Sequence, residues 1–302
     1  MLDARTRNRN ATRLRPVRAP GLPVEAMVLG KPVRDAADLL PRLFNLCRAA
    51  QALAVHRALG LLVSDDLKDE LRREILRDHL LKLSVSLPAQ FGAGPRALPP
   101  DWATDPISVA LALFGAPAAP PATAEDFESF LTGGTATGAL LNQIDQCFAK
   151  GEAATGILEP FTRSAPNDVS PAENSVAGRH SLQPVMRHIA ETRGRGPLWR
   201  ATARIYDIAA SLNDRLPVAV TDDAGRIFVP ATRGAYAVSA QSENGVVTAF
   251  ARITPTDHLL VADGILDRTL ATLPAEKEGL APLILEILDP CSPLRLKEPG
   301  HA

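Results

Sequence analysis

Apolar residues in this 302-residue chain recur at helical spacing for most of its length and at strand spacing only near its end. Over residues 36–60 and 66–84 they fall at positions i, i+3, i+4 and i+7, which is the pattern of one buried helix face. Pro41 lies either in the first turn of the first helix or at a break in it. We therefore predict two long helices, the first of which buries Cys47 and Gln51.

The spacing changes after Pro217. Short strand-like segments flank the sequences Asp-Asp-Ala-Gly and Ser-Glu-Asn-Gly, and Asn244-Gly245 favours the positive φ angles of a type I′ turn. This pattern predicts β hairpins in a small antiparallel sheet over residues 217–260. A last helix over 276–288 precedes Asp289-Pro290-Cys291.

Proline separates these regions. Eight of the 26 prolines lie between residues 88 and 121 and predict an extended connection, because proline does not fit a helix interior. The polar, proline-containing stretch 159–183 is expected to be a mobile surface loop. Short helices are predicted over 125–131 and 139–150, and helical spacing returns over 199–212.

Charge and composition exclude several classes of protein. Thirty-three basic and 34 acidic side chains give a net charge of -1, which provides no attraction for nucleic acid or an anionic membrane. No apolar run approaches the roughly 20 residues that span a bilayer, so we expect no membrane insertion. Three widely spaced cysteines suggest reduced thiols and a cytoplasmic location.

The N-terminus is rich in arginine. Six arginines and one acidic residue lie in the first 20 residues, and no apolar segment follows that could form the core of a signal peptide. We expect residues 1–23 to be a flexible basic tail and residues 24–302 to form a single domain. A docking arm for an acidic partner is the alternative for the tail.

Common catalytic motifs are missing. The sequence has no Cys-x-x-Cys, His-x-x-x-His, Gly-x-Gly-x-x-Gly or Gly-x-Ser-x-Gly. Gly133-Gly134 lacks the Lys and Ser/Thr of a phosphate-binding loop and is interpreted as a turn. We therefore predict no catalytic residue.

Two cysteines nevertheless occur in a recognisable arrangement. Cys47 lies in Arg-x-Phe-x-x-Cys-x-x-x-Gln, and Cys291 lies in Asp-Pro-Cys-x-x-Leu. The pair resembles the large subunit of nickel-iron hydrogenases, whose metal site is held by Arg-x-Cys-Gly-x-Cys-x-x-x-His near the N-terminus and Asp-Pro-Cys-x-x-Cys-x-x-His at the C-terminus. Thr232-Arg233-Gly234 and Thr254-Pro255-Thr256 are similar, in the same order, to the Pro-Arg-Gly and Pro-Thr/Ser segments of that family.

The departures from the family motifs decide the expected function. Phe44 and Leu294 stand where two of the four cysteines would be, and Gln51 and Lys297 replace the histidines. Because nickel needs the full set of soft thiolate ligands, we expect no nickel and no hydrogen oxidation.

The Leu-Phe-x-Leu-Cys pattern is similar to that of the HupK family of hydrogenase expression and formation proteins. The resemblance implies an α+β, mainly α fold: a helical core like that of the hydrogenase large subunit, with the chain ends meeting at the site, and a small antiparallel sheet. It implies a non-catalytic scaffold or chaperone in hydrogenase maturation. The expected partners are the large-subunit precursor and an iron-delivering complex of the HypC/HypD type.

The resemblance also implies a site for a transient Fe(CN)2CO fragment. Cys47 and Cys291 would be the metal ligands. Arg233 and Thr256 would donate hydrogen bonds to the cyanides, and Pro255 would line the carbon monoxide side.

Other interpretations stay open. Cys47 alone could be inert packing, and Asp289-Pro290-Cys291 could simply end a helix. Cys147 is expected in the core and His79 in a structural role. The whole chain could instead be a metal-free mimic of the large subunit that binds or protects maturation partners, or a degenerate hydrogenase subunit with residual catalysis.

Overall fold

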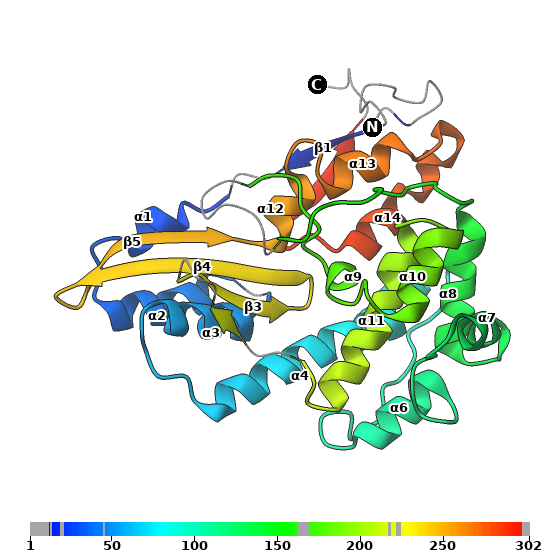
Figure 1. Cartoon of the computed structure of the whole chain (residues 1–302), viewed down its shortest axis with the longest axis horizontal. Coiled ribbons are helices and arrows are strands. Elements are labelled where there is room, and N and C mark those ends of the chain that lie inside the picture. The colour runs from blue at the N-terminus through cyan, green and yellow to red at the C-terminus, as the bar shows by residue number, and fades with distance from the viewer. Residues whose placement is uncertain are drawn as a thin grey trace.

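A computed structural model of the chain describes residues 12, 14–18, 21–44, 46–161, 169–216, 219–221 and 225–297. A helical body forms one half of the molecule, and a four-stranded sheet extends from it (Figure 1). The predicted mainly helical α+β fold with a small antiparallel sheet is confirmed.

The helices are short apart from two. They are α1 (Val24–Val28), α2 (Val33–Leu43), α3 (Arg48–Ala58), α4 (Asp65–Leu81), α5 (Leu87–Ala89), α6 (Pro106–Phe114), α7 (Ala124–Thr132), α8 (Ala136–Cys147), α9 (Val176–Arg179), α10 (Pro184–Thr192), α11 (Pro197–Leu212), α12 (Pro255–Leu260), α13 (Ile265–Ala271) and α14 (Ala281–Leu288). A π-helical segment, Lys82–Ser86, continues α4, and a 3-10 helix, Ala275–Leu280, precedes α14.

The strands form two sheets. The larger has the order β2-β3-β4-β5 with antiparallel neighbours, and the smaller pairs the two ends of the described chain, β1 with β6. Their bounds are β1 (Arg15–Arg18), β2 (Val220–Thr221), β3 (Ile227–Ala231), β4 (Gly234–Glu243), β5 (Val246–Ile253) and β6 (Leu294–Lys297).

Helix α11 is the centre of the helical body. Every residue from Pro197 to Ile208 is buried, as expected for a helix covered on all sides. Helices α4, α8, α9, α10 and α14 all pack against it. Its buried polar residues Arg200, Arg204 and Asp207 therefore need partners inside the protein.

The sheet has its own apolar cluster. Helices α2 and α3 lie below the sheet in Figure 1, and α3 packs on β3 and β4. The β4–β5 turn has φ angles of 51° at Asn244 and 76° at Gly245, which confirms the predicted hairpin.

The prediction of one continuous helix over residues 36–60 is wrong, because the structure has two helices, α2 and α3, in this range. The break lies between Leu43 and Arg48, and Pro41 is inside α2. Cys47 has a left-handed φ of 54°, and Glu74 of α4 accepts hydrogen bonds from the backbone N–H groups of Ala49 (2.9 Å) and Ala50 (3.4 Å). A carboxylate from a distant helix thus satisfies the new helix N-terminus.

The proline-rich connection and the predicted surface loop also need correction. Residues 88–121 contain α6, whose first residue is Pro106 and whose cap is Asp105, because proline fits the first turn of a helix. Residues 162–168 lie outside the described residues, but the remainder of 159–183 contains α9 and the buried residues Glu173 and Asn174.

At the chain ends, Arg15–Arg18 forms a strand with Leu294–Lys297, so this part of the predicted tail is ordered by pairing with a distant segment. Residues 1–11, 13 and 19–20 lie outside the described residues. Residues 255–260, predicted with the sheet, form α12 because Thr254 and Asp257 make a capping box and Pro255 occupies the first turn. The predicted C-terminal helix over 276–288 lies in the 3-10 helix and α14.

The other helix predictions are confirmed. Residues 66–84 lie in α4 and its π-helical continuation, 125–131 in α7 and 199–212 in α11. The predicted helix 139–150 corresponds to α8, which begins three residues earlier and ends at Cys147.

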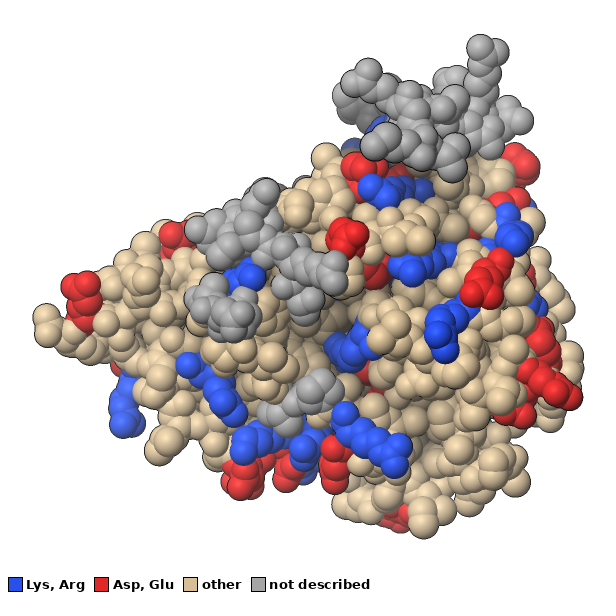
Figure 2. All heavy atoms as spheres, viewed as in Figure 1, with Lys and Arg blue, Asp and Glu red and all other residues tan. Residues whose placement is uncertain are grey.

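Charged side chains of opposite sign alternate along α4, at the lower edge in Figure 2. Ion pairs join Lys68 to Asp65 and Arg72 to Asp69. No helix in the described part of the chain is both long and apolar enough to cross a membrane.

Candidate functional site

The two cysteines from opposite ends of the chain meet between the sheet and the helical body. Cys47 lies at the break between α2 and α3 and is 1% exposed, and Cys291 follows α14. Each thiol shifts the pKa of the other, which requires the two side chains to lie close together. The fold therefore brings both predicted metal ligands into one site.

The two thiols have very different acidities. The hydrogen bond donated by Cys47 lowers the pKa of Cys291 to about 6, and Arg233 acts in the same direction. That bond, together with burial, raises the pKa of Cys47 well above its ordinary value. At neutral pH the pair is one thiolate and one thiol sharing a proton, and the thiolate is the form that binds metal.

Arg233 touches both the thiol pair and a carboxylate. It lies in the turn between β3 and β4, where its Nη1 donates to Cys47 Sγ (3.3 Å) and its Nη2 donates to Asp289 Oδ1 (3.3 Å). The next residue, Gly234, has a φ of 151°, and a Cβ there would lie 2.6 Å from the carbonyl oxygen of Asn174. Only glycine allows this turn to approach the 174 segment so closely.

Two side chains hold the turn in place. Asn174 forms hydrogen bonds with both the N–H (2.7 Å) and the C=O (2.9 Å) of Ala235. Arg179 donates to the carbonyl oxygens of Ala231 and Gly234 and pairs with both Asp207 oxygens at 2.7 Å. The position of Arg233 is thus fixed by the segment that the sequence suggested was a mobile loop.

Asp289 is the anionic centre of the polar side. It has a left-handed φ of 55° at the end of α14, and its carboxylate lies 3.1 Å from Lys82 Nζ and 3.5 Å from Arg204 Nη2. Burial by itself would raise the pKa of Asp289, but Arg204, Arg233 and Lys82 outweigh it and hold the pKa at about 2. The carboxylate therefore stays ionised and anchors Arg233.

Thr256 and Pro255 lie in the first turn of α12. The backbone N–H of Cys291 donates to Thr256 Oγ1 (2.8 Å), and the hydroxyl of Thr256 in turn helps to lower the pKa of Cys291. Pro255 lines the neighbouring cavity. All five predicted site residues thus lie around one place.

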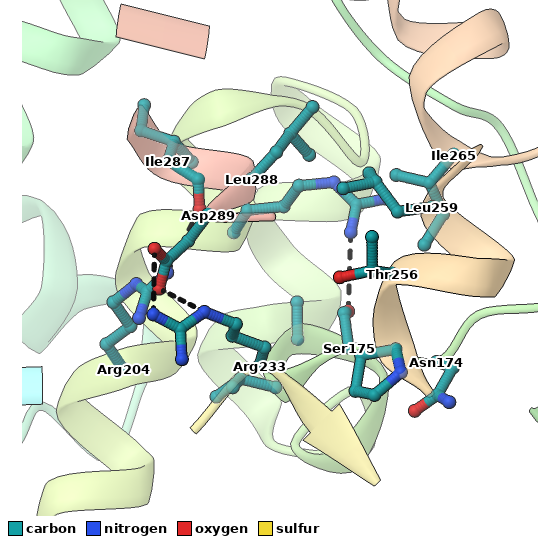
Figure 3. Close-up of a pocket in the computed structure, with 14 residues that line it drawn as sticks. Asn174, Ser175, Arg204, Arg233, Thr256, Leu259, Ile265, Ile287, Leu288 and Asp289 are labelled. Carbon is teal, nitrogen blue, oxygen red and sulfur yellow. Dashed lines mark hydrogen bonds and ion pairs between the residues drawn. The ribbon is translucent and has the colours of Figure 1, made fainter. Parts of the chain in front are cut away.

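A small cavity of about 30 Å³ opens beside this cluster. Figure 3 shows Arg204 and Arg233 directed at Asp289 on one side, and Thr256, Leu259 and Ile265 on the other. A cavity of this size holds one or two water-sized groups. It has a cationic wall and an apolar wall.

The cationic wall carries donors that the described residues leave unused. Arg200, Arg204 and Arg233 all line the cavity, and within the described part of the chain the Nε atoms of Arg200 and Arg204 are buried without a hydrogen-bond acceptor, whereas Arg233 Nε lies 3.3 Å from Asp289 Oδ2. An unsatisfied buried donor costs about 1–3 kcal/mol, so these atoms favour a ligand that accepts hydrogen bonds.

Sequence reasoning missed the network behind this wall. His79, fully buried, contacts Asp207 Oδ2 through Nε2 (2.8 Å) and Arg204 Nη1 through Nδ1 (3.1 Å). Burial lowers the pKa of His79, so it is neutral at physiological pH. The available signal was the spacing of Arg200, Arg204 and Asp207 along one side of α11, a helix whose apolar residues already predicted burial.

Phe44 and Gln51, which replace metal-binding residues of the hydrogenase motif, lie with Arg252 on the side of Cys47 away from the cavity. Gln51 is 3% exposed, and its Nε2 donates to the Leu46 carbonyl oxygen (3.1 Å). Arg252 of β5 donates to Gln51 Oε1 (3.0 Å) and lies 4.5 Å from the centre of the Phe44 ring. Leu294, in β6, belongs to another apolar cluster.

Cys147 is half-buried at the edge of the helical core, where its thiol donates to the Gln143 carbonyl oxygen (3.2 Å). The prediction of a core residue is therefore only partly right. Among the residues that the structure describes, no group of three or more His, Cys, Asp or Glu side chains is arranged to hold a metal ion.

Comparison with known proteins gives one close relative. The chain is 46% identical over 281 residues to the hydrogenase expression/formation protein HupK of Rhodobacter capsulatus. The alignment covers 93% of this chain and 92% of the relative. No family model matches the sequence.

Solved structures share the fold at low identity. A chain of the Ni-Fe-Se hydrogenase of Desulfovibrio vulgaris Hildenborough matches 90% of this chain with a TM-score of 0.55 and 14% identity. A chain of a NAD+-reducing [NiFe]-hydrogenase matches 93% with a TM-score of 0.53 and 13% identity. The fold is that of nickel-iron hydrogenase large subunits.

Proposed function

The chain belongs to the HupK family of hydrogenase expression/formation proteins, and from that premise we propose that it transiently holds an Fe(CN)2CO fragment at Cys47 and Cys291 during hydrogenase maturation. The observation that carries the proposal is the coupled thiol pair beside a cavity with unused guanidinium donors. The chain would act as a non-catalytic scaffold in the cytoplasm.

The thiol pair suits an iron atom that brings its own ligands. Two cyanides and one carbon monoxide already fill much of the coordination sphere, so two thiolates suffice to hold the fragment. Cys291 is a thiolate at neutral pH, and Cys47 loses its proton when the metal binds. Arg233, 3.3 Å from Cys47 Sγ, stabilises the second negative charge.

The cavity walls suit the diatomic ligands. A cyanide nitrogen is an anionic acceptor, and the buried Nε–H groups of Arg200 and Arg204 are donors without an acceptor in the described structure. Carbon monoxide accepts hydrogen bonds poorly, and Pro255, Leu259 and Ile265 provide apolar contact for it. Both kinds of wall meet in the same cavity, and because its volume is about 30 Å³ these walls would have to move apart to admit all three diatomic ligands.

Infrared spectroscopy tests the proposal. We expect cyanide and carbon monoxide stretching bands from protein purified after co-expression with an iron-delivering complex of the HypC/HypD type. Cys47→Ala and Cys291→Ala should abolish the bands, and Cys147→Ala, which removes the thiol outside the site, should retain them. Absence of bands from the unmodified protein, or their persistence in both site variants, would overturn the proposal.

A second candidate rests on the fold itself. A chain with the fold of the large subunit could dock maturation partners as a metal-free mimic. Capture of the large-subunit precursor, unaffected by Cys47→Ala and Cys291→Ala and without infrared bands, would favour this candidate. Hydrogen uptake by the purified protein with metals supplied would instead indicate residual catalysis, which we do not expect from two thiolates.

A further inference from the structure

Arg252 is the cation on the side of Cys47 where the motif residues are missing. The two residues that replace the first cysteine and the histidine of the N-terminal motif, Phe44 and Gln51, are the two that hold it. The guanidinium lies 4.5 Å from the centre of the Phe44 ring and donates to Gln51 Oε1 at 3.0 Å. A planar guanidinium suits both contacts, because it stacks on the ring and donates in its plane.

These contacts place Arg252 against the segment that carries Cys47. Phe44 lies three residues before Cys47, and the backbone N–H of Gln51 donates to the Cys47 carbonyl oxygen (3.0 Å). The amide of Gln51 therefore links the first turn of α3 to Arg252. The charge of Arg252 is also felt at Cys291 and Tyr236, the latter a buried residue of β4.

The partners of Arg252 leave its charge in place. An amide oxygen and an aromatic ring attract a guanidinium without neutralising it, unlike the carboxylate that Arg233 and Arg204 share. Asp257 acts on Arg252 through space, but its carboxylate accepts hydrogen bonds from the backbone N–H and the hydroxyl of Thr254. Arg252 therefore remains a fixed positive charge beside the thiol pair.

A fixed positive charge discriminates between two kinds of metal cargo. A bare divalent cation carries two positive charges and is repelled by Arg252, more strongly where burial lowers the local dielectric constant. An iron(II) ion with two cyanides and one carbon monoxide has no net charge, so the same guanidinium hardly opposes it. The site can thus hold thiolates without collecting free metal ions.

We propose that Arg252, held by Phe44 and Gln51, is a specificity-determining residue that excludes bare divalent cations such as Ni²⁺ from the Cys47–Cys291 pair. This inference rests on the proposed function for the cargo that the site accepts. The exclusion of free metal ions concerns the protein alone and is measured without any maturation partner.

Nickel binding to the purified, reduced protein tests the inference. Equilibrium dialysis against Ni²⁺ should show that Arg252→Met, which keeps the length but removes the charge, increases the apparent affinity about tenfold or more. Arg252→Lys keeps a charge and should stay close to the unmodified protein. Arg268→Met, which removes a half-buried arginine paired with Asp263, is the control and should leave the nickel affinity unchanged.

Two further variants keep the test decisive. The increase in nickel affinity must disappear in the double variant Cys47→Ala/Arg252→Met, since the nickel is expected to bind at the thiols. If Arg252→Met does not fold, as judged by circular dichroism, Arg252→Gln removes the same charge with a polar side chain. This variant should show the same gain in nickel affinity, and unchanged affinity would overturn the inference.

The outcomes separate the two proposals. Unchanged nickel affinity in Arg252→Met, a gain that survives Cys47→Ala, or equal gains in the Met and Lys variants would overturn the role of the Arg252 charge. None of these results affects the infrared test. Loss of the infrared bands in the unmodified protein, with the nickel gain intact, would overturn the iron cargo alone.

Discussion

The basic side chains on the two sides of Cys47 have different kinds of partner. On the side of residues that match the hydrogenase motifs, Lys82, Arg204 and Arg233 converge on the carboxylate of Asp289. On the side where the motif residues are replaced, Arg252 is held by an amide and an aromatic ring. On the matching side the cations share a carboxylate, whereas on the replaced side the cation has neutral partners.

This difference suggests how a binding site can lose one metal and keep another. Under the proposed function, the matching side would supply the donors and the apolar contacts for a ligated iron fragment. The replaced side supplies a positive charge instead of ligands. We conclude that the loss of two cysteines is accompanied by a rebuilt wall and does not simply leave a gap, which makes the comparison testable on each side.

The largest effect is expected from Asp289→Asn. The variant leaves Arg204, Arg233 and Lys82 without the carboxylate that compensates them, and breaking a buried ion pair costs about 3–5 kcal/mol. The free energy of unfolding, from urea titration followed by circular dichroism, measures this loss. Asp263→Asn, which breaks the exposed pair with Arg268 at 2.8 Å, should cost no more than about 1 kcal/mol. Equal losses in the two variants would mean that the cluster is not a special feature of the matching side.

The next effect concerns how Arg233 is positioned. In Gly234→Ala the new Cβ would lie 2.6 Å from the Asn174 carbonyl oxygen at a φ of 151°, so overpacking and backbone strain should together cost about 2–4 kcal/mol. Gly245→Ala, in the turn that follows the same strand, has a φ of 76° but open space around it and should cost about 1–2 kcal/mol. Thermal unfolding of both variants gives the difference. A smaller loss for Gly234→Ala would show that the turn does not need its close approach to residue 174.

The smallest effect is on the acidity of the thiol pair. Cys47→Ala removes the hydrogen bond to the Cys291 thiolate, and a bond to a charged group contributes about 1.5–3 kcal/mol, so the pKa of Cys291 should rise from about 6 by roughly 1–2 units. Thiolate absorbance at 240 nm against pH measures the midpoint, in a Cys147→Ala background that removes the third thiol.

The sign of the accompanying stability change follows from the lowered pKa. Because the folded protein loses the Cys291 proton at lower pH than the unfolded chain, this group adds stability above the unfolded pKa, and that contribution is lost as pH falls through about 6. Cys47→Ala should shift the loss to higher pH. An unchanged midpoint would argue against the proton shared by the two cysteines.

Local sequence signals were reliable where local interactions decide the structure. The spacing of apolar residues gave α4 and α11, and Asn244-Gly245 gave the β4–β5 turn. The break before Cys47 could not be predicted in this way, because Glu74, a residue of another helix, caps the new N-terminus. The burial of Asn174 likewise depends on its contact with Ala235 in the sheet.

The sequence by itself determined the candidate residues, because Cys47, Cys291, Arg233, Pro255 and Thr256 stand in recognisable motif positions whatever their three-dimensional arrangement. Only the tertiary structure decided that Arg233, Pro255 and Thr256 line one cavity, that each thiol acts on the pKa of the other, and that Arg252 occupies the replaced side. The physical reason is that these properties arise from contacts between residues far apart in the chain. Spacing along a sequence cannot specify the distance, the burial or the charge of such neighbours.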